Sequence, residues 1–179
     1  RWSPDGTHLA FLAKDPVSRK TQIFLLSMKG GDPLRATVDK QGVDDYAWGP
    51  DGKRIAFIAQ GPPLNAKAIK THNKAFQVTN GHFLLTREVA PWHLWVTPAA
   101  GGNAKQLTSG DFSLGTDQGG TTTPSWSPDG KRIAFTRIPG VHWASAFQSV
   151  IAEVEVTSGH TKILVSGQTS DHFEFAPAG

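Results

Sequence analysis

Short apolar runs recur along the chain in matching sequence contexts. Three of them contain the dipeptide Ala-Phe and occupy residues 9–11, 55–57 and 133–135. Around the middle run both faces of an extended strand would be apolar, with Ile55, Phe57 and Ala59 on one face and Ala56 and Ile58 on the other. This pattern predicts an inner strand packed between two neighbouring layers, since a strand with one wet face would alternate apolar and polar residues.

A turn sequence precedes each of these runs. Three pentapeptides carry the pattern Trp-Ser/Gly-Pro-Asp-Gly, at residues 2–6, 48–52 and 126–130, and a worn copy occupies 175–179. Proline fixes φ early in a turn, Asp closes an Asx-turn, and Gly supplies a positive φ. An aromatic residue, this turn and an alternating apolar run together predict a β-hairpin. We therefore interpret the repeated Asp as a turn residue and not as a catalytic carboxylate.

The spacing of the repeated aromatic residue predicts the architecture. Equivalent positions are Trp2, Trp48, Trp126 and Phe175, which are separated by 46, 78 and 49 residues. A four-stranded propeller blade takes about 40–50 residues, so the middle unit carries an insertion. We predict an all-β fold with about three four-stranded blades of a β-propeller. The expected blades span about 1–43, 44–120 and 121–170, and a further blade starts at 171–179.

The remainder of each unit fits this prediction. The third strands are expected at 23–26, 94–96 and 151–156, and the fourth strands at 34–37, 105–108 and 162–165. No helix of convincing length competes, because the most helix-friendly stretch, 65–76, is short and follows two prolines. Residues 1–2 and 171–175 would belong to innermost strands. An open arc of three blades exposes strand edges, so we expect part of a larger ring, or copies that assemble as a homo-oligomer.

Composition narrows the function classes. The 179 residues include 19 Gly and 12 Pro, which suits a turn-rich all-β chain, and no Cys that could bind metal or form a disulfide. The net charge is only +3 and the basic residues are scattered, so we expect no nucleic-acid partner despite the basic isoelectric point. No apolar stretch has the length of a membrane span. We expect no cofactor, and the compartment, cytoplasmic or periplasmic, stays open.

The segment 126–135, Trp-Ser-Pro-Asp-Gly-Lys-Arg-Ile-Ala-Phe, resembles the propeller repeat that TolB-type proteins share with prolyl-oligopeptidase-like serine peptidases. The second unit is similar to acylaminoacyl-peptidase and dipeptidyl-peptidase propellers at residues 93–102 and 105–110. Its insertion, at 70–78 and followed by 83–88, has the same similarity and is not expected in the compact TolB repeat.

This resemblance implies a non-catalytic propeller portion of a serine peptidase. Such a propeller covers the active site of a C-terminal α/β-hydrolase domain and limits the access of peptide substrates. The chain has no Gly-x-Ser-x-Gly nucleophile elbow, so no catalytic residue can be assigned to it and we expect no enzymatic activity of its own. The alternative is a TolB-like propeller that serves as a scaffold for protein–protein interaction.

A few residues are candidates for ligand contacts. Asp44 and Asp171 each stand four residues before the repeated aromatic residue, so both would lie near a central channel, where they could attract a ligand. Solvated carboxylates at strand ends are the alternative. Arg87 and Glu88 follow the insertion, and in some similar propellers charged residues of insertions bind a peptide terminus.

Other distinctive residues have structural interpretations. The aromatic residues and glycines of the repeat are expected to anchor the blades, namely Trp2, Gly6, Trp48, Gly52, Trp126 and Gly130. The seven histidines, at 8, 72, 82, 93, 142, 160 and 172, lack metal-ligand spacing. Trp92 and Trp143 could lie at a binding edge, although tryptophans that pack loops are more common.

Overall fold

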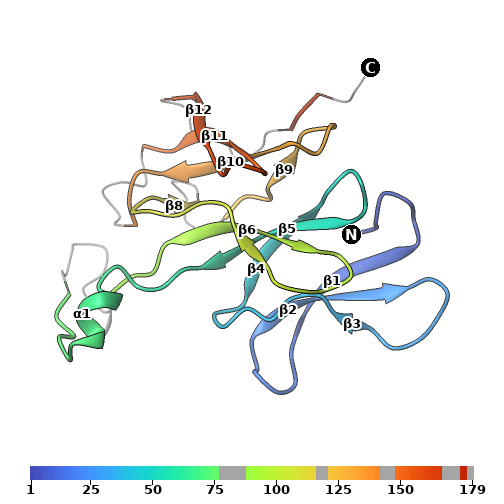
Figure 1. The fold of residues 1–179 in the computed structure, drawn as a ribbon, viewed down its shortest axis with the longest axis horizontal. Helices are drawn as coiled ribbons and strands as arrows, with labels where there is room; N and C mark the ends of the chain where they lie inside the picture. The colour runs from blue at the N-terminus through green and yellow to red at the C-terminus, as the bar shows by residue number, and fades with distance from the viewer. Residues whose placement is uncertain (77–87, 116–120, 142–147, 167–173, 177–179) are drawn as a thin grey trace.

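The computed structural model describes residues 1–76, 88–115, 121–141, 148–166 and 174–176. Over these residues the chain forms three antiparallel sheets and one short helix (Figure 1). The prediction of an all-β chain is confirmed. We call the three sheets, with their connecting turns, the first, second and third units.

The strands follow the chain order in the first and second units. The first unit contains β1 (His8–Lys14), β2 (Thr21–Ser27) and β3 (Leu34–Arg35). The second contains β4 (Val43–Trp48), β5 (Arg54–Gln60), β6 (Trp92–Pro98) and β7 (Lys105–Gln106) in that spatial order. The third contains β8 (Ser113–Leu114), β9 (Ser125–Trp126), β10 (Arg132–Ile138), β11 (Val150–Glu155) and β12 (Thr161–Val165).

The third unit departs from a simple chain-order sheet. β10 pairs with β8 through Leu114 and with β9 through Trp126, so two short segments share the inner side of one strand. Strand β8 lies within the range expected for the second blade but hydrogen-bonds to the third sheet. The inner side of this unit is therefore built from residues on both sides of position 120, the expected boundary between the second and third blades.

The same residue pairs recur where each turn joins the first two strands. Trp48 pairs with Ile55 and Trp126 with Ile133, and in the first unit an isolated bridge joins Trp2 to Leu9. The turn glycines Gly52 and Gly130 have φ values of 64° and 66°, in the left-handed region that favours glycine. The predicted hairpin turns are confirmed.

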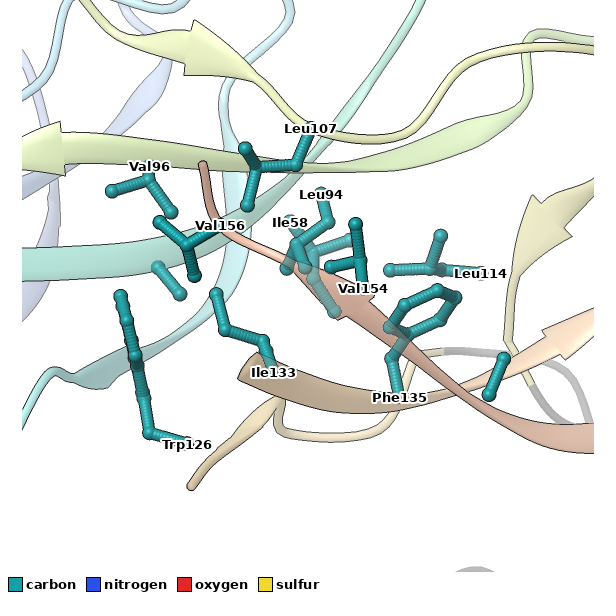
Figure 2. Packing of buried hydrophobic residues seen from close by; sticks show 12 residues of the cluster. Ile58, Leu94, Val96, Leu107, Leu114, Trp126, Ile133, Phe135, Val154 and Val156 are labelled. Carbon is teal, nitrogen blue, oxygen red and sulfur yellow. The ribbon is translucent and has the colours of Figure 1, made fainter. Parts of the chain in front are cut away.

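The second unit lies between the other two, and its strand β5 contributes to two cores (Figure 1). Ile55, Phe57 and Ala59 pack toward the first unit, whereas Ala56 and Ile58 pack toward the third. Figure 2 shows this second core, where side chains of the second and third units meet. The alternation read from the sequence thus places β5 between two layers, as predicted.

The aromatic anchors differ in burial. Trp126 is 9% exposed and lies in the core between the second and third units, and Trp48 packs against the core between the first and second. Trp2 is 58% exposed. Each of the other two tryptophans packs on the preceding unit, and no described unit precedes Trp2, so its role as an anchor stays a prediction.

The only helix among the described residues is α1 (Ala66–Lys70), which has no buried residue. It falls within the stretch that the sequence marked as most helix-friendly, between β5 and β6. No helix in the described part of the chain is long and apolar enough to cross a membrane.

Candidate functional site

Asp44 lies near the start of β4 and contacts the third unit. The hydroxyl of Thr121 donates a hydrogen bond to Asp44, and the hydroxyl of Thr123 donates one to the neighbouring Asp45. The guanidinium of Arg1 also pairs with Asp45, at 2.7 Å between Nη1 and Oδ1. These contacts join residues of all three units, so the two carboxylates link β4 to chain segments of both neighbouring units. A ligand contact of Asp44 stays a prediction.

The other predicted contact residues are only partly described. Glu88 accepts a hydrogen bond from the backbone N–H of Val89 at 2.9 Å. Arg87 and Asp171 lie outside the described residues, as do Trp143 and the histidines 82, 142 and 172. Trp92 is partly buried and packs against the core between the second and third units, which favours the packing interpretation.

Ser3, Asp5 and His8 are the residue types of a catalytic triad, but their hydrogen bonds belong to a turn. The Ser3 hydroxyl donates to Asp5 Oδ1 at 2.6 Å and accepts the backbone N–H of His8 at 2.9 Å. A nucleophilic serine would instead donate to a histidine ring that acts as a base.

The third unit repeats this turn without a histidine. Ser127 donates to Asp129 at 2.7 Å and accepts the backbone N–H of Arg132 at 2.9 Å. Since Arg132 takes the place of His8 in the same hydrogen-bonded turn, the turn does not need a histidine, and the arrangement is structural. Hydrogen bonds from Ser3 and from Thr7 lower the pKa of Asp5 to about 2, so this carboxylate is ionised at neutral pH.

The interface between the second and third units is closed by Arg54. Its Nε donates to Asp51 Oδ2 at 2.8 Å, and its Nη2 donates to the carbonyl of Gly130 at 3.1 Å. The guanidinium carbon lies 5.0 Å from the ring centroid of Trp126, within the range of a cation–π contact. One arginine therefore binds a turn carboxylate, a turn carbonyl and the repeated aromatic residue of the next unit.

Some contacts recur from one interface to the next. Arg132 stands in the position of Arg54 and lies 5.3 Å from the ring of Phe175, the worn copy of the aromatic residue. The indole N–H of Trp126 donates to the carbonyl of Ala47, and that of Trp48 donates to the carbonyl of Arg1, in each case the residue before the preceding tryptophan. Each unit thus docks on the preceding one in the same way.

The interface between the first and second units contains a cavity of about 660 Å³ at this position. His8 occupies the place of Arg54, and Asp5, Trp48 and Gly52 line the cavity together with it. A Cβ added to Gly130 would lie 2.9 Å from Arg54 Nη2, whereas among the described residues a Cβ on Gly52 would meet only Pro4, at 3.7 Å. The space that Arg54 fills in one interface is therefore open in the other.

The comparisons with known proteins concern the fold. No family model matches the chain, and no curated protein matches it either. Solved structures do match. The chain has the TolB-like β-propeller fold. At identities of 18% and below these matches show the fold alone, and the predicted propeller fold is confirmed.

Three of the matching structures are of proteins of different kinds. TolB from Acinetobacter baumannii is 18% identical with a TM-score of 0.53, over 89% of this chain and 31% of that one. The acylaminoacyl peptidase of Pyrococcus horikoshii is 14% identical with a TM-score of 0.59, over 92% of this chain and 24% of that one. Oligogalacturonate lyase from Vibrio parahaemolyticus is 11% identical with a TM-score of 0.58, over 94% and 39%. The chain therefore spans well under half the length of each of these three proteins.

The second blade also buries a histidine. His93 on β6 is 3% exposed and meets the ring of Phe112 edge-on, with ring centroids 5.6 Å apart. Burial is the largest influence on the pKa of His93 and lowers it, against a backbone hydrogen bond at Gly110 that raises it. The described residues contain no group of three or more His, Cys, Asp or Glu side chains that could hold a metal ion.

We expect the propeller to lose stability as the pH falls below about 6.5. His93 has a lowered pKa in the folded chain, whereas the unfolded chain takes up this proton near the ordinary value of 6.5. The unfolded state then binds more protons, so stability falls from that pH down through the folded pKa. Urea unfolding between about pH 8 and pH 5 measures the effect. His93→Gln should flatten the pH dependence and the exposed His160→Gln should not; equal slopes in wild type and His93→Gln would contradict the prediction.

The inter-blade cavity was not found from sequence, although one signal for it exists. When the repeats are aligned on their tryptophans, Arg54 and Arg132 align with His8. This difference marks the first interface as unusual. Its consequence can be recognised only when the contacts of Arg54 in the second interface are known.

Proposed function

We propose that this chain is the non-catalytic propeller portion of a prolyl-oligopeptidase-type serine peptidase, in which it limits the access of peptides to a hydrolase domain. The insertion in the second blade carries the proposal. It lies in the connection between β5 and β6, residues 61–91, which includes α1. The sequence of its stretch 70–78 resembles acylaminoacyl-peptidase propellers, and the peptidase of Pyrococcus horikoshii shares the fold over 92% of this chain.

A scaffold function is the second candidate, and one surface feature favours it. Strand β12 is the last strand of its sheet, and Ile163, Leu164 and Val165 are between 42% and 49% exposed. An apolar strand at a sheet edge can pair with an extended segment of a partner. The shared fold with TolB from Acinetobacter baumannii agrees with this alternative.

The reading frame downstream of Gly179 distinguishes the two proposals. A Gly-x-Ser-x-Gly elbow followed by Asp and His supports the peptidase, and a stop codon soon after the last blade supports the scaffold. If the elbow is present, the complete protein should cleave short acyl-peptides and exclude folded proteins of the same cleavage sequence. Equal rate constants for the short peptide and the folded protein would overturn the access-limiting role.

The 179-residue chain alone should neither hydrolyse acyl-peptides or p-nitrophenyl esters nor react with a fluorophosphonate probe. A serine nucleophile needs a base within hydrogen-bond reach, and the hydroxyls of Ser3 and Ser127 donate to carboxylates of their own turns. Intact-mass spectrometry after incubation with the probe measures this, with an active serine hydrolase as the positive control. Stoichiometric labelling of a single serine would contradict the assignment.

A further inference from the structure

We call the interface between the second and third units, which Arg54 fills, the closed interface, and the interface between the first and second units, which contains the cavity, the open interface. The contacts of Arg54 show which interactions the open interface lacks. In the closed interface the guanidinium joins Asp51, the carbonyl of Gly130 and the ring of Trp126. The equivalent residues of the open interface are Asp5, Gly52 and Trp48, and all three line the cavity. The three hydrogen bonds that Asp5 accepts from its turn go to Oδ1, the same oxygen by which Asp51 accepts the N–H of Lys53. In Asp51 the other oxygen, Oδ2, binds the arginine.

His8 cannot replace the arginine. Its side chain is shorter, and its Nδ1 lies 2.8 Å from the hydroxyl of Thr7, within the same turn. A ring held there does not reach the next unit as Arg54 does, which explains why the cavity remains at this interface.

A second basic side chain of the closed interface is also missing from the open one. Lys105 on β7 reaches across to the third blade, where its ammonium donates to the carbonyls of Val156 at 3.3 Å and Thr157 at 2.8 Å. Leu34 occupies the position of Lys105 in the first blade. Lys105 pairs with Val96 on the neighbouring strand, and Leu34 pairs with Leu25 at the equivalent place. Leu34 is 74% exposed, so it does not fill the corresponding space.

The carbonyl partners of Lys105 have counterparts at the cavity. The backbone N–H of Val156 donates to the carbonyl of Lys131, and that of Ala99 donates to the carbonyl of Lys53 in the same position of its blade. Val156 and Thr157 therefore correspond to Ala99 and Ala100, and both of these line the cavity. The open interface therefore has no counterpart of the Arg54 guanidinium or the Lys105 ammonium, although the residues that would surround both groups are present.

The remaining charges of the cavity are compatible with a cationic ligand. Asp32 lines the cavity at the place where the second blade has the neutral Asn103, which adds a carboxylate. Arg35 also lines it, but its guanidinium pairs with the buried Asp15 at 2.9 Å. Lys53, which also lines the cavity, aligns with Lys131. Lys131 stands beside Gly130 in the closed interface and does not prevent Arg54 from binding there.

We propose that the cavity binds a basic peptide segment of a partner protein. An arginine of that segment places its guanidinium on Trp48, between Asp5 and the carbonyl of Gly52, as Arg54 does on Trp126. A second cationic side chain then lies near Ala99 and Ala100, as Lys105 does beside the third blade. The proposal is independent of whether the chain belongs to a peptidase or a scaffold.

Titration of the 179-residue chain with the peptide acetyl-Arg-Lys-amide tests this site. The indole N–H resonances, assigned with Trp48→Phe and Trp126→Phe, should show a saturable shift for Trp48 and none for Trp126, which Arg54 already covers. Replacing arginine by the uncharged citrulline should weaken binding about tenfold or more, because charge-assisted hydrogen bonds and the cation–π contact are lost.

Matched variants separate occupancy of the cavity from net charge. His8→Arg should close the cavity in the manner of Arg54 and abolish the Trp48 shift, whereas His8→Gln should retain binding. His160→Arg adds the same charge on the third blade and should bind like the wild type. Binding by His8→Arg at wild-type affinity, equal affinity for the citrulline peptide, or no saturable shift of Trp48 would each overturn the proposal.

Discussion

Phe57→Ala is expected to lower the free energy of unfolding by about 3–5 kcal/mol, the usual cost of removing a buried aromatic side chain from a packed core. Phe57 is 1% exposed, lies at the centre of β5 and stacks on Trp95 with ring centroids 6.3 Å apart. Its removal leaves a void between the first and second blades, because the surrounding strands relax only in part. Urea unfolding followed by far-ultraviolet circular dichroism measures the loss.

Val17→Ala provides the control for this measurement. Val17 is 87% exposed in the turn between β1 and β2, so its truncation should change stability by less than about 0.5 kcal/mol. If Phe57→Ala costs no more than Val17→Ala, the two blades are not packed through β5 as described.

Gly130→Val is expected to destabilise the chain by about 1–3 kcal/mol from backbone strain, with a further loss from a steric contact. Gly130 has a φ of 66°, which a β-branched residue strongly disfavours. The new Cβ would also lie 2.9 Å from Arg54 Nη2, so the guanidinium, which donates to the Gly130 carbonyl, would have to shift. Thermal melts and urea unfolding quantify both effects.

Gly52→Val is the matched variant, since Gly52 has a φ of 64° and its added Cβ would meet only Pro4 among the described residues. It should show the strain without the contact with an arginine. The difference between the two variants then measures the Arg54 contact. An unchanged melting midpoint for both would mean that neither turn requires a left-handed residue.

The fold was largely predictable because its signals are local. Proline and glycine restrict or extend the φ range of single residues, and the repeated Pro-Asp-Gly turns therefore placed the hairpins correctly. The alternation in β5 predicted a strand between two layers, since side chains two residues apart share a face. The turn interpretation of Asp5 and Asp129 was also correct, because their hydrogen bonds link residues only two positions away.

The candidate site was not predictable, because it depends on contacts between units. Asp44 was selected for its position near the start of an inner strand, but its bond to Thr121 crosses 77 residues of sequence. The burial of Trp126 and the exposure of Trp2 follow from which blade packs beside each, although both occupy the same motif.

The repeat, the turns and the strand faces of this protein follow from its amino-acid sequence, since each depends on the backbone preferences and side-chain spacing of neighbouring residues. The roles of Arg54, which closes one interface, and of His8, which leaves the other open, became visible in the folded chain. The two residues are equivalent in sequence, and the difference arises from how far each side chain reaches across to the turn of the next blade.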